Sequence, residues 1–428
     1  MSASAPQRLG IRDVLGIPDY RRVWMAQAIS DVGDGTTTLL LLLVINALTH
    51  STTALAIMSI ALVAPKFTVG LLAGVYVDRW DRRRVMLAAD LARVVIVLGF
   101  AIGQTAALVP LLVLLGLVES SVGSFFTPAR GALLPHIVPA HGLPAANSLS
   151  QATMMVAMVV GSGIAGLLFG VYHTAWPGYV IDAATFGLSF LLVLRVSPAA
   201  GRILRGDEHH PAPSGVFRSL ADGLAIVRRS RLLMGTLLGA ATTMLGLGAV
   251  NVLFVPLLVN DLHVAPAWMA AVDGAQATAM VMAATVVAWV MSRLSAQTII
   301  TAALAGLAVF TLALAGVSSI WQVIALLYAA GWLVTPLQAA MATVVQTSVA
   351  DSVRGRIGSL LSASMSTANV TSMALAGIFA DLLTTRTVYV LAAAICGAAS
   401  VVAFLIFRGI GSAEAPSLIP QRDSIDLA

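Results

Sequence analysis

The chain has 428 residues, of which 59% are hydrophobic and 10% are charged, and its mean hydropathy is +0.94, whereas soluble domains carry about 25% charged residues. A water-soluble fold of this length could not cover such an apolar surface, so the composition predicts an integral membrane protein. The formal charge of +5 does not indicate nucleic-acid binding, because the basic residues lie in short loops and are not interleaved with aromatic residues.

The single cysteine, Cys396, lies inside the last apolar run. It excludes an intrachain disulfide, a cysteine-based metal cluster and a CxxC redox motif. We also expect no metal and no cofactor.

Apolar runs long enough to cross about 30 Å of hydrocarbon recur from Val23 to Phe407. They predict an all-α membrane protein with twelve transmembrane helices. The expected spans are residues 22–46, 52–76, 85–104, 107–127, 144–170, 176–195, 232–259, 266–292, 297–316, 319–346, 358–383 and 387–408. Residues 1–21 lack the apolar core and cleavage site of a secretory signal, so we expect the first helix to be the membrane anchor.

The loop arginines are distributed unevenly. Loops of one parity hold most of them, from Arg79 to Arg356, and loops of the other parity hold only Arg386. Because cytoplasmic loops retain Lys and Arg, this asymmetry places both termini in the cytoplasm and requires an even number of helices.

A long polar connection divides the chain. Residues 196–231 contain three prolines and six arginines, which predicts a cytoplasmic linker between six-helix halves at residues 22–195 and 232–408, followed by a cytoplasmic tail at 409–428. From Val216 onward the linker could form an interfacial amphipathic helix. An offset of 211 residues supports the division, since it lays Val138, Ser148 and Leu149 on Val349, Ser359 and Leu360.

The loop between the second and third predicted helices carries a motif. It reads Gly74-Val-Tyr-Val-Asp78-Arg79-Trp80-Asp81-Arg82-Arg83-Arg84. This resembles the signature loop of the major facilitator superfamily, Gly-x-x-x-Asp-Arg-x-Gly-Arg-Arg, with Asp81 at the position where glycine is commonest. The corresponding loop of the second half keeps only Arg293.

The motif suggests a cytoplasmic gate. Gly74 permits close helix approach, and Asp78 can accept N–H groups at a helix N-terminus and pair with arginines. The alternative is that the arginines only set topology. The expected gate residues are Gly74, Asp78, Arg79, Asp81, Arg82, Arg83, Asp90, Arg93, Arg130, Asp351, Arg354 and Arg356.

Further likeness covers nearly the whole chain and points to the drug-efflux branch of the superfamily, which includes macrolide, tetracycline, multidrug and enterobactin exporters. The matching segments are Tyr20–Trp24, Ser30–Asp34, Phe126–Arg130, Ala146–Leu149 and Asp351–Arg356. The fifth helix departs from the Gly-Pro-x-x-Gly-Gly pattern of proton antiporters, because it has Gly161, Gly163 and Gly166 without the proline. These small residues still favour tight helix packing.

Two ionisable residues are predicted near mid-depth in the membrane. Charge there is costly, so Asp34 of the first helix and Lys66 of the second, the only lysine in the chain, need a partner or water. One hypothesis is that they pair in one state of a transport cycle and that protonation of Asp34 releases Lys66 or the substrate. A permanent structural ion pair is the alternative.

Other polar residues are candidates for the same cavity. Glu119 could carry a proton or bind a cationic drug, or be a hydrogen-bonded structural acid, and Asp31 could replace Asp34. Asp182 is interpreted as structural. The remaining cavity candidates are Asp273, Asn251 and Gln338.

These observations predict a multi-pass transporter of the bacterial cell membrane, monomeric in the bilayer. It would export amphipathic small molecules or drugs by alternating access, with proton antiport as its energy source. The alternatives are a lipid or lysolipid flippase of the same fold and a transport-dead membrane sensor. A membrane enzyme or an ATP-driven pump is disfavoured because the catalytic motifs and the phosphate-binding loop are missing.

Overall fold

The computed structural model describes residues 9–77, 79–102, 105–201, 216–228, 230–349 and 351–408. They form helices joined by short connections. The long helices are α2 (Pro18–Thr49), α3 (Thr52–Val77), α4 (Arg82–Phe100), α5 (Val109–Ile137), α6 (Leu143–Tyr172), α7 (Trp176–Leu194), α9 (Arg231–Pro256), α10 (Met269–Arg293), α11 (Ala296–Ala315), α12 (Ile320–Ser348), α13 (Asp351–Leu382) and α14 (Thr385–Arg408). The short ones are α1 (Ile11–Leu15), α8 (Val216–Val227), the π-helix η4 (Leu257–Asp261) and the 3₁₀ turns η1 (Ala106–Leu108), η2 (Ala140–Gly142), η3 (Pro198–Gly201) and η5 (Pro266–Trp268).

Local sequence explains where several helices begin and end. The side chains of Asp81, Ser230 and Ser295 accept a backbone N–H in the first turn of α4, α9 and α11, as N-cap residues do. At the other end of their helices, His50 and His173 adopt a left-handed conformation and terminate α2 and α6.

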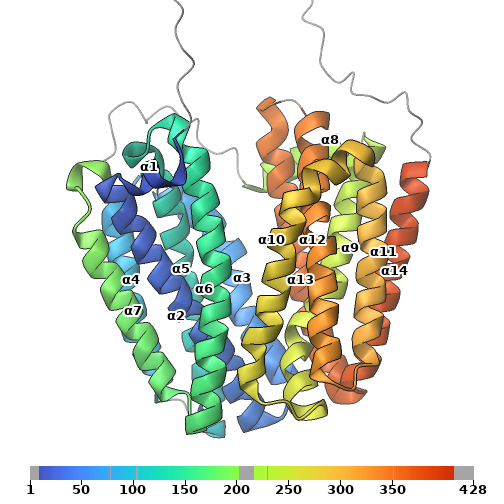
Figure 1. Cartoon of the computed structure of the whole chain (residues 1–428), viewed down its shortest axis with the longest axis horizontal. Helices are drawn as coiled ribbons and strands as arrows, with labels where there is room; N and C mark the ends of the chain where they lie inside the picture. The colour runs from blue at the N-terminus through green and yellow to red at the C-terminus, as the bar shows by residue number, and fades with distance from the viewer. Residues whose placement is uncertain are drawn as a thin grey trace, which may run out of the picture.

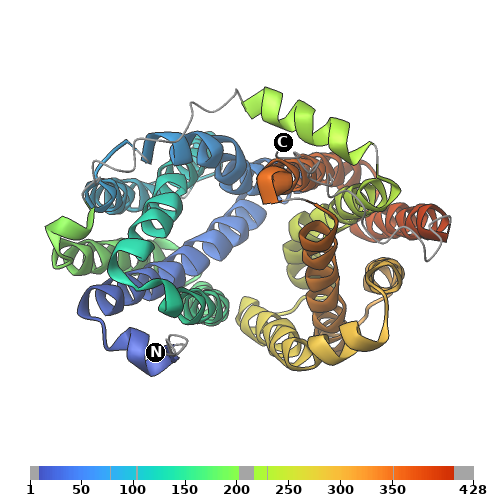
Figure 2. The same cartoon turned by 90° about the horizontal axis from the view of Figure 1, so that it is seen from above.

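The long helices form two bundles (Figures 1 and 2). In the first, α2 packs against α6 and α7, and α5 packs against α3 and α4; in the second, α9 packs against α13 and α14, and α12 packs against α10 and α11. The short helix α8 lies against α13 and α9, with Val227 buried. The amphipathic helix predicted in the linker therefore exists, but it packs on protein rather than on the lipid interface alone.

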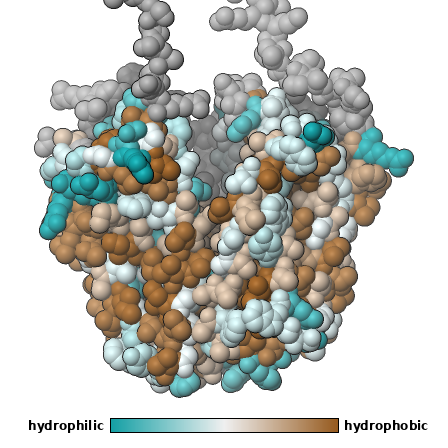
Figure 3. Space-filling view, in the orientation of Figure 1, coloured by the Kyte–Doolittle hydropathy of each residue, from teal (hydrophilic) through white to brown (hydrophobic). Residues whose placement is uncertain are grey.

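The outside of the bundles suits a bilayer. Ten of the described helices are long and apolar enough to span a membrane, and α4 and α13, which are more polar, lie among them. On the face drawn in Figure 3, hydrophobic side chains cover much of the middle of the molecule, and hydrophilic ones gather toward its two ends. On α4, for example, Leu91, Val95 and Ile102 form an exposed stripe that continues past the end of the helix. The number of twelve spans and the side of the termini stay predictions.

The bundles meet at one end of the molecule. We name the end with α1, α8 and the loop of Arg79–Arg84 the basic end, and the other the opposite end. The bundles approach one another at the opposite end and lie apart at the basic end (Figure 1). Between described residues, the hydrogen bonds that join the bundles all lie at the opposite end, from Asn46 to Asn260 and from Ser51–Thr53 to Gly377 and Asp381.

Candidate functional site

Three ionisable side chains from three helices of the first bundle form a buried ionic cluster: Asp34 of α2, Arg93 of α4 and Glu119 of α5. Arg93 Nη2 contacts Asp34 Oδ1, and Arg93 Nε donates to Glu119 Oε1 at 2.7 Å. The side chains of Arg93 and Glu119 are 7% and 11% exposed, whereas that of Asp34 is 38% exposed. One guanidinium therefore bridges two carboxylates, and the carboxylate of Asp34 is the accessible one.

Neighbouring residues make room for the guanidinium. Its Cζ lies 3.9 Å from the ring centroid of Phe186 on α7, a cation–π contact. On α5, a Cβ added at Gly123 would lie 3.4 Å from Arg93 Cζ. The small residue on α5 and the aromatic ring on α7 thus hold the guanidinium between α2 and α5.

Two further carboxyl groups are buried close to the cluster. Thr37 Oγ1 donates to Asp182 Oδ2 at 2.5 Å, and Asp182 packs directly on Gly33, beside Asp34. Asp90, one turn from Arg93 on α4, is fully buried and accepts a hydrogen bond of 2.7 Å from Ser189. Both acids accept hydrogen bonds from hydroxyl groups, as buried carboxyl groups require.

Two expected gate residues of α4 have their described partners inside the first bundle. Asp90 and Arg93 were predicted to extend the cytoplasmic gate, but Arg93 lies in the buried ionic cluster and Asp90 contacts α7. The reason is rotational, because both residues face the bundle interior while the apolar stripe of α4 faces outward. Sequence reasoning also missed the proximity of Asp182; a charged residue on an otherwise apolar helix was the available signal.

The expected partner of Asp34 lies elsewhere in this state. Asp34 pairs with Arg93, whereas Lys66 is exposed on α3 and forms no ion pair with a described residue. Asp31 does not share the partner of Asp34, because it accepts from Gln27, which in turn contacts Arg130. A pair between Asp34 and Lys66 in another state stays a prediction.

The candidates of the second bundle are more dispersed. Asn251 and Gln338 are exposed, on α9 and α12. Asp273 of α10 is half-buried near Ser162 of α6, at the contact between the bundles. These three residues do not join the ionic cluster.

The motif loop ties the helices of the first bundle together. Asp81 Oδ1 accepts the backbone N–H of Arg84, Arg82 contacts His136 of α5, and Arg83 Nη2 donates to the carbonyl of Leu194 at 2.6 Å at the end of α7. Each of these contacts stays within the first bundle. Arg83 thereby donates hydrogen bonds to carbonyl groups that lack a partner at the C-terminus of α7.

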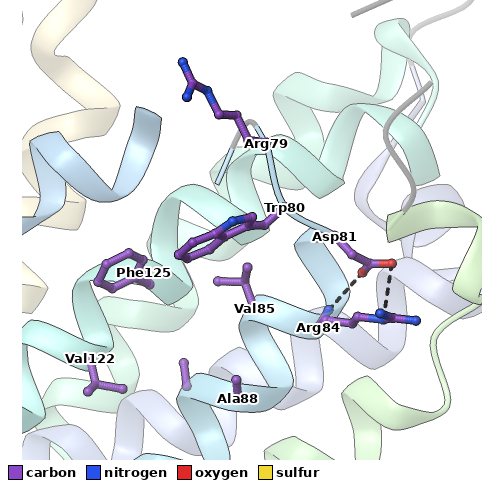
Figure 4. Close-up of a pocket in the computed structure, with 9 residues that line it drawn as sticks. Arg79, Trp80, Asp81, Arg84, Val85, Ala88, Val122 and Phe125 are labelled. Atoms are coloured by element: carbon purple, nitrogen blue, oxygen red, sulfur yellow. Dashed lines mark hydrogen bonds and ion pairs between the residues drawn. The ribbon is translucent and has the colours of Figure 1, made fainter. Parts of the chain in front are cut away.

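A pocket of about 560 Å³ lies beneath this loop (Figure 4). Trp80 covers it and stacks on Phe125, with ring centroids 6.4 Å apart. Arg79 and Arg84 stand at its rim, and Val85 belongs to its apolar floor on α4.

The remaining gate candidates are only partly placed. Asp78 lies outside the described residues, and so do the surroundings of Gly74, Asp351 and Arg354. Arg356 pairs with Asp222 of α8 at 3.5 Å, and its side chain is 44% exposed. It therefore connects the linker helix to α13.

The glycines of α6 lie at close helix contacts. A Cβ at Gly161 would lie 2.6 Å from the carbonyl oxygen of Val32 on α2, and one at Gly163 would lie 3.2 Å from Ala270 Cβ in the other bundle. Gly166 meets the backbone of Pro266. These glycines thus allow α6 to pack closely against α2 of its own bundle and against η5 and α10 of the other bundle.

Comparison with known proteins identifies the family of this chain. The family described as transmembrane secretion effector, a branch of the major facilitator superfamily, matches residues 14–423. The chain belongs to this family. Its relatives and its fold are those of transporters, not enzymes.

Three relatives are exporters by name. The chain is 28% identical over 250 residues to macrolide efflux protein A of Streptococcus pyogenes, covering 56% of this chain and 59% of that protein, and so less than two thirds of its length. It is 27% identical over 338 residues to the multidrug efflux pump Tap of Mycobacterium tuberculosis, covering 76% and 78%. It is 30% identical over 371 residues to the enterobactin exporter EntS of Shigella boydii, covering 84% and 85%.

Solved structures share the fold at low sequence identity. The nucleoside transporter NupG superposes with a TM-score of 0.73 at 12% identity, covering 91% of this chain and 99% of that one. A bacterial homologue of the iron transporter ferroportin, in an inward-facing state, gives 0.72 at 14% identity, covering 91% and 98%.

Proposed function

We propose that this protein is a secondary active exporter of amphipathic small molecules, driven by proton antiport and working by alternating access. The observation that carries the proposal is the buried ionic cluster of Asp34, Arg93 and Glu119. The relatives named above are exporters, which supports the direction of transport.

The charges of the cluster suit proton coupling. One guanidinium balances one carboxylate, so the three groups in their ionised forms carry a net charge of −1 in a setting where uncompensated charge is costly. A single proton, or a substrate cation, makes the cluster neutral. Competition between these two positive charges for the same carboxylates is the physical basis of an antiport.

Asp34 is the group through which we propose the exchange occurs. Its side chain is the most exposed of the cluster, and protonation would remove its attraction to Arg93. In the other state of the cycle, Lys66 would take the place of Arg93 beside Asp34. Glu119 would hold Arg93 in position throughout.

Alternating access is supported by the contacts between the bundles. They are joined at the opposite end, and the described contacts of the motif loop stay within the first bundle. We propose that the basic end is cytoplasmic, that twelve helices span the membrane, and that the bundles rock so that the motif loop reaches α13 when the opposite end opens.

Purified proteoliposomes with an imposed pH gradient test the proposal. Tetraphenylphosphonium or ethidium should produce a proton flux with the wild type that is lost in Asp34→Asn and retained in Asp13→Asn, which removes a carboxylate of the short helix α1. Equal fluxes in wild type and Asp34→Asn would contradict coupling through this residue. Movement of a lysolipid analogue between leaflets, without drug-dependent flux, would instead support a flippase.

A further inference from the structure

A single carboxylate accepts half of the hydrogen bonds that join the two bundles between described residues. Asp381, near the end of α13, accepts the backbone N–H groups of Thr52 at 2.7 Å and Thr53 at 3.0 Å. It also accepts the hydroxyl groups of Thr52 at 2.7 Å and Ser51 at 2.8 Å. All four donors lie at the first turn of α3.

This arrangement is an N-cap supplied by the other bundle. The first N–H groups of a helix lack partners within the helix and carry partial positive charge, so a carboxylate at that position is stabilising. A capping side chain normally comes from the residue that precedes its own helix. Here the cap of α3 comes from α13, so it exists only while the opposite end is closed.

The helix contact beneath the cap is one of a related pair. A Cβ at Gly377 of α13 would meet Ala56 and lie 3.0 Å from the carbonyl oxygen of Thr52; a Cβ at Gly166 of α6 would meet Pro266 and lie 2.9 Å from Ala267 Cα. The offset of 211 residues that relates the two halves converts Gly166 to Gly377 and Ala56 to Ala267. The contacts of α13 with α3 and of α6 with η5 and α10 are therefore structural copies.

Only the α3–α13 contact has a capping carboxylate; the related contact of α6 with η5 and α10 has none. The offset that relates the halves places Gly170 at the position of Asp381, and a Cβ added at Gly170 would meet nothing within 4 Å. It places Leu262, His263 and Val264 at the positions of Ser51, Thr52 and Thr53, which removes the hydroxyl donors. Pseudo-symmetric helix packing closes both sides, but polar capping holds one side only.

We propose that Asp381 is a one-sided latch of the opposite end, which sets how often the α3–α13 contact opens, while the α6–α10 contact has no such helix cap. This inference rests on the alternating access proposed above. Asp381 acts as a positioning residue for the conformational change and does not touch the ionic cluster. Because the latch is charged and the contact is partly exposed, its loss should shift the equilibrium without unfolding either bundle.

Distances between spin labels test the latch. The native cysteine is buried, so Cys396→Ala provides a background for one label pair at Ile57 and Leu382, across α3–α13, and a second at Val171 and Trp268, across the other contact. All four positions are exposed. Double electron–electron resonance in nanodiscs then reports the fraction of molecules open at this end.

Asp381→Asn removes the charge and replaces one carboxylate oxygen, which accepts two of the four hydrogen bonds, with an amide group that can only donate. The open fraction at the α3–α13 pair should therefore rise about fivefold, the ratio that corresponds to the net contribution of about one hydrogen bond. Ser51→Ala with Thr52→Val removes the hydroxyl donors and keeps the charge, so it should give a smaller shift in the same direction. Asp261→Asn is the matched control, because Asp261 is an exposed acid at the same end whose side chain makes no hydrogen bond with a described residue.

The outcomes separate the latch from the proposed function. One outcome is that tetraphenylphosphonium with a pH gradient opens the wild type, while Asp381→Asn and the wild type have the same open fraction without drug. That result would refute the latch and leave alternating access standing. If the wild type and all variants stay closed under every condition, both proposals fail. An equal shift in Asp261→Asn would attribute the effect to net charge and also refute the latch.

Discussion

Asn46 of α2 and Asn260 of η4 exchange two hydrogen bonds across the bundles, with each Nδ2 donating to the other's Oδ1 at 2.9 and 3.0 Å. Each residue lies near the end of the first long helix of its half. The pair therefore joins the two bundles at the opposite end, and each amide satisfies a donor and an acceptor of the other.

This pair predicts a reversible lock. With Asn46→Cys and Asn260→Cys in the Cys396→Ala background, a short bifunctional methanethiosulfonate reagent should join the bundles and abolish transport, because the opposite end could no longer open. Reductant should restore transport. The reagent should leave the two single-cysteine variants active; full transport by the joined protein would show that this end need not open.

The buried ionic cluster predicts a large stability effect at Arg93. Arg93→Met leaves two carboxylates without their counter-charge and should destabilise the fold by about 3–5 kcal/mol, as removal of one partner of a buried ion pair does. Thermal unfolding in detergent measures this. Arg84→Ala, at a side chain 84% exposed, should change stability by less than about 0.5 kcal/mol.

The same cluster predicts a rescue. Adding Asp34→Asn and Glu119→Gln to Arg93→Met removes the uncompensated charges and should restore most of the lost thermal stability. Proton-coupled transport should stay absent. A triple variant as unstable as Arg93→Met would mean that packing, not charge, explains the loss.

Two glycines of α6 form a matched pair of sites. Gly161→Ala places a Cβ against the Val32 carbonyl oxygen and the Thr36 nitrogen, 2.6 and 2.8 Å away, and should destabilise the first bundle by about 1–3 kcal/mol. Gly170→Ala meets nothing within 4 Å and should be neutral or slightly stabilising. Equal unfolding temperatures for the two variants would contradict the close contact of α2 and α6.

Lys66 separates a coupling role from a structural one. It is exposed and makes no ion pair with a described residue in this state, so Lys66→Ala should leave the unfolding temperature unchanged. If Lys66 replaces Arg93 beside Asp34 during transport, drug-dependent proton uptake by vesicles should fall severalfold. Uptake indistinguishable from wild type would refute this exchange.

Much of the fold follows from one-dimensional patterns. Apolar runs of membrane length predict the helices because unpaired backbone groups cannot exist in hydrocarbon, and the motif loop with its arginines indicates the superfamily. The same patterns identify Asp34 and Glu119 as candidate functional residues, because each is an isolated charge within an apolar run.

The partners of these charges required the tertiary structure. Hydropathy measures depth along a helix but not rotation about its axis, so it could not show that Arg93 faces Asp34 while Lys66 is exposed. Nor could it connect Asp381 to Ser51 and Thr52, which lie in the other half of the chain. The sequence by itself determined which segments enter the membrane, because burial in lipid depends on local composition; which charges meet, and which end is closed, depended on how the helices pack.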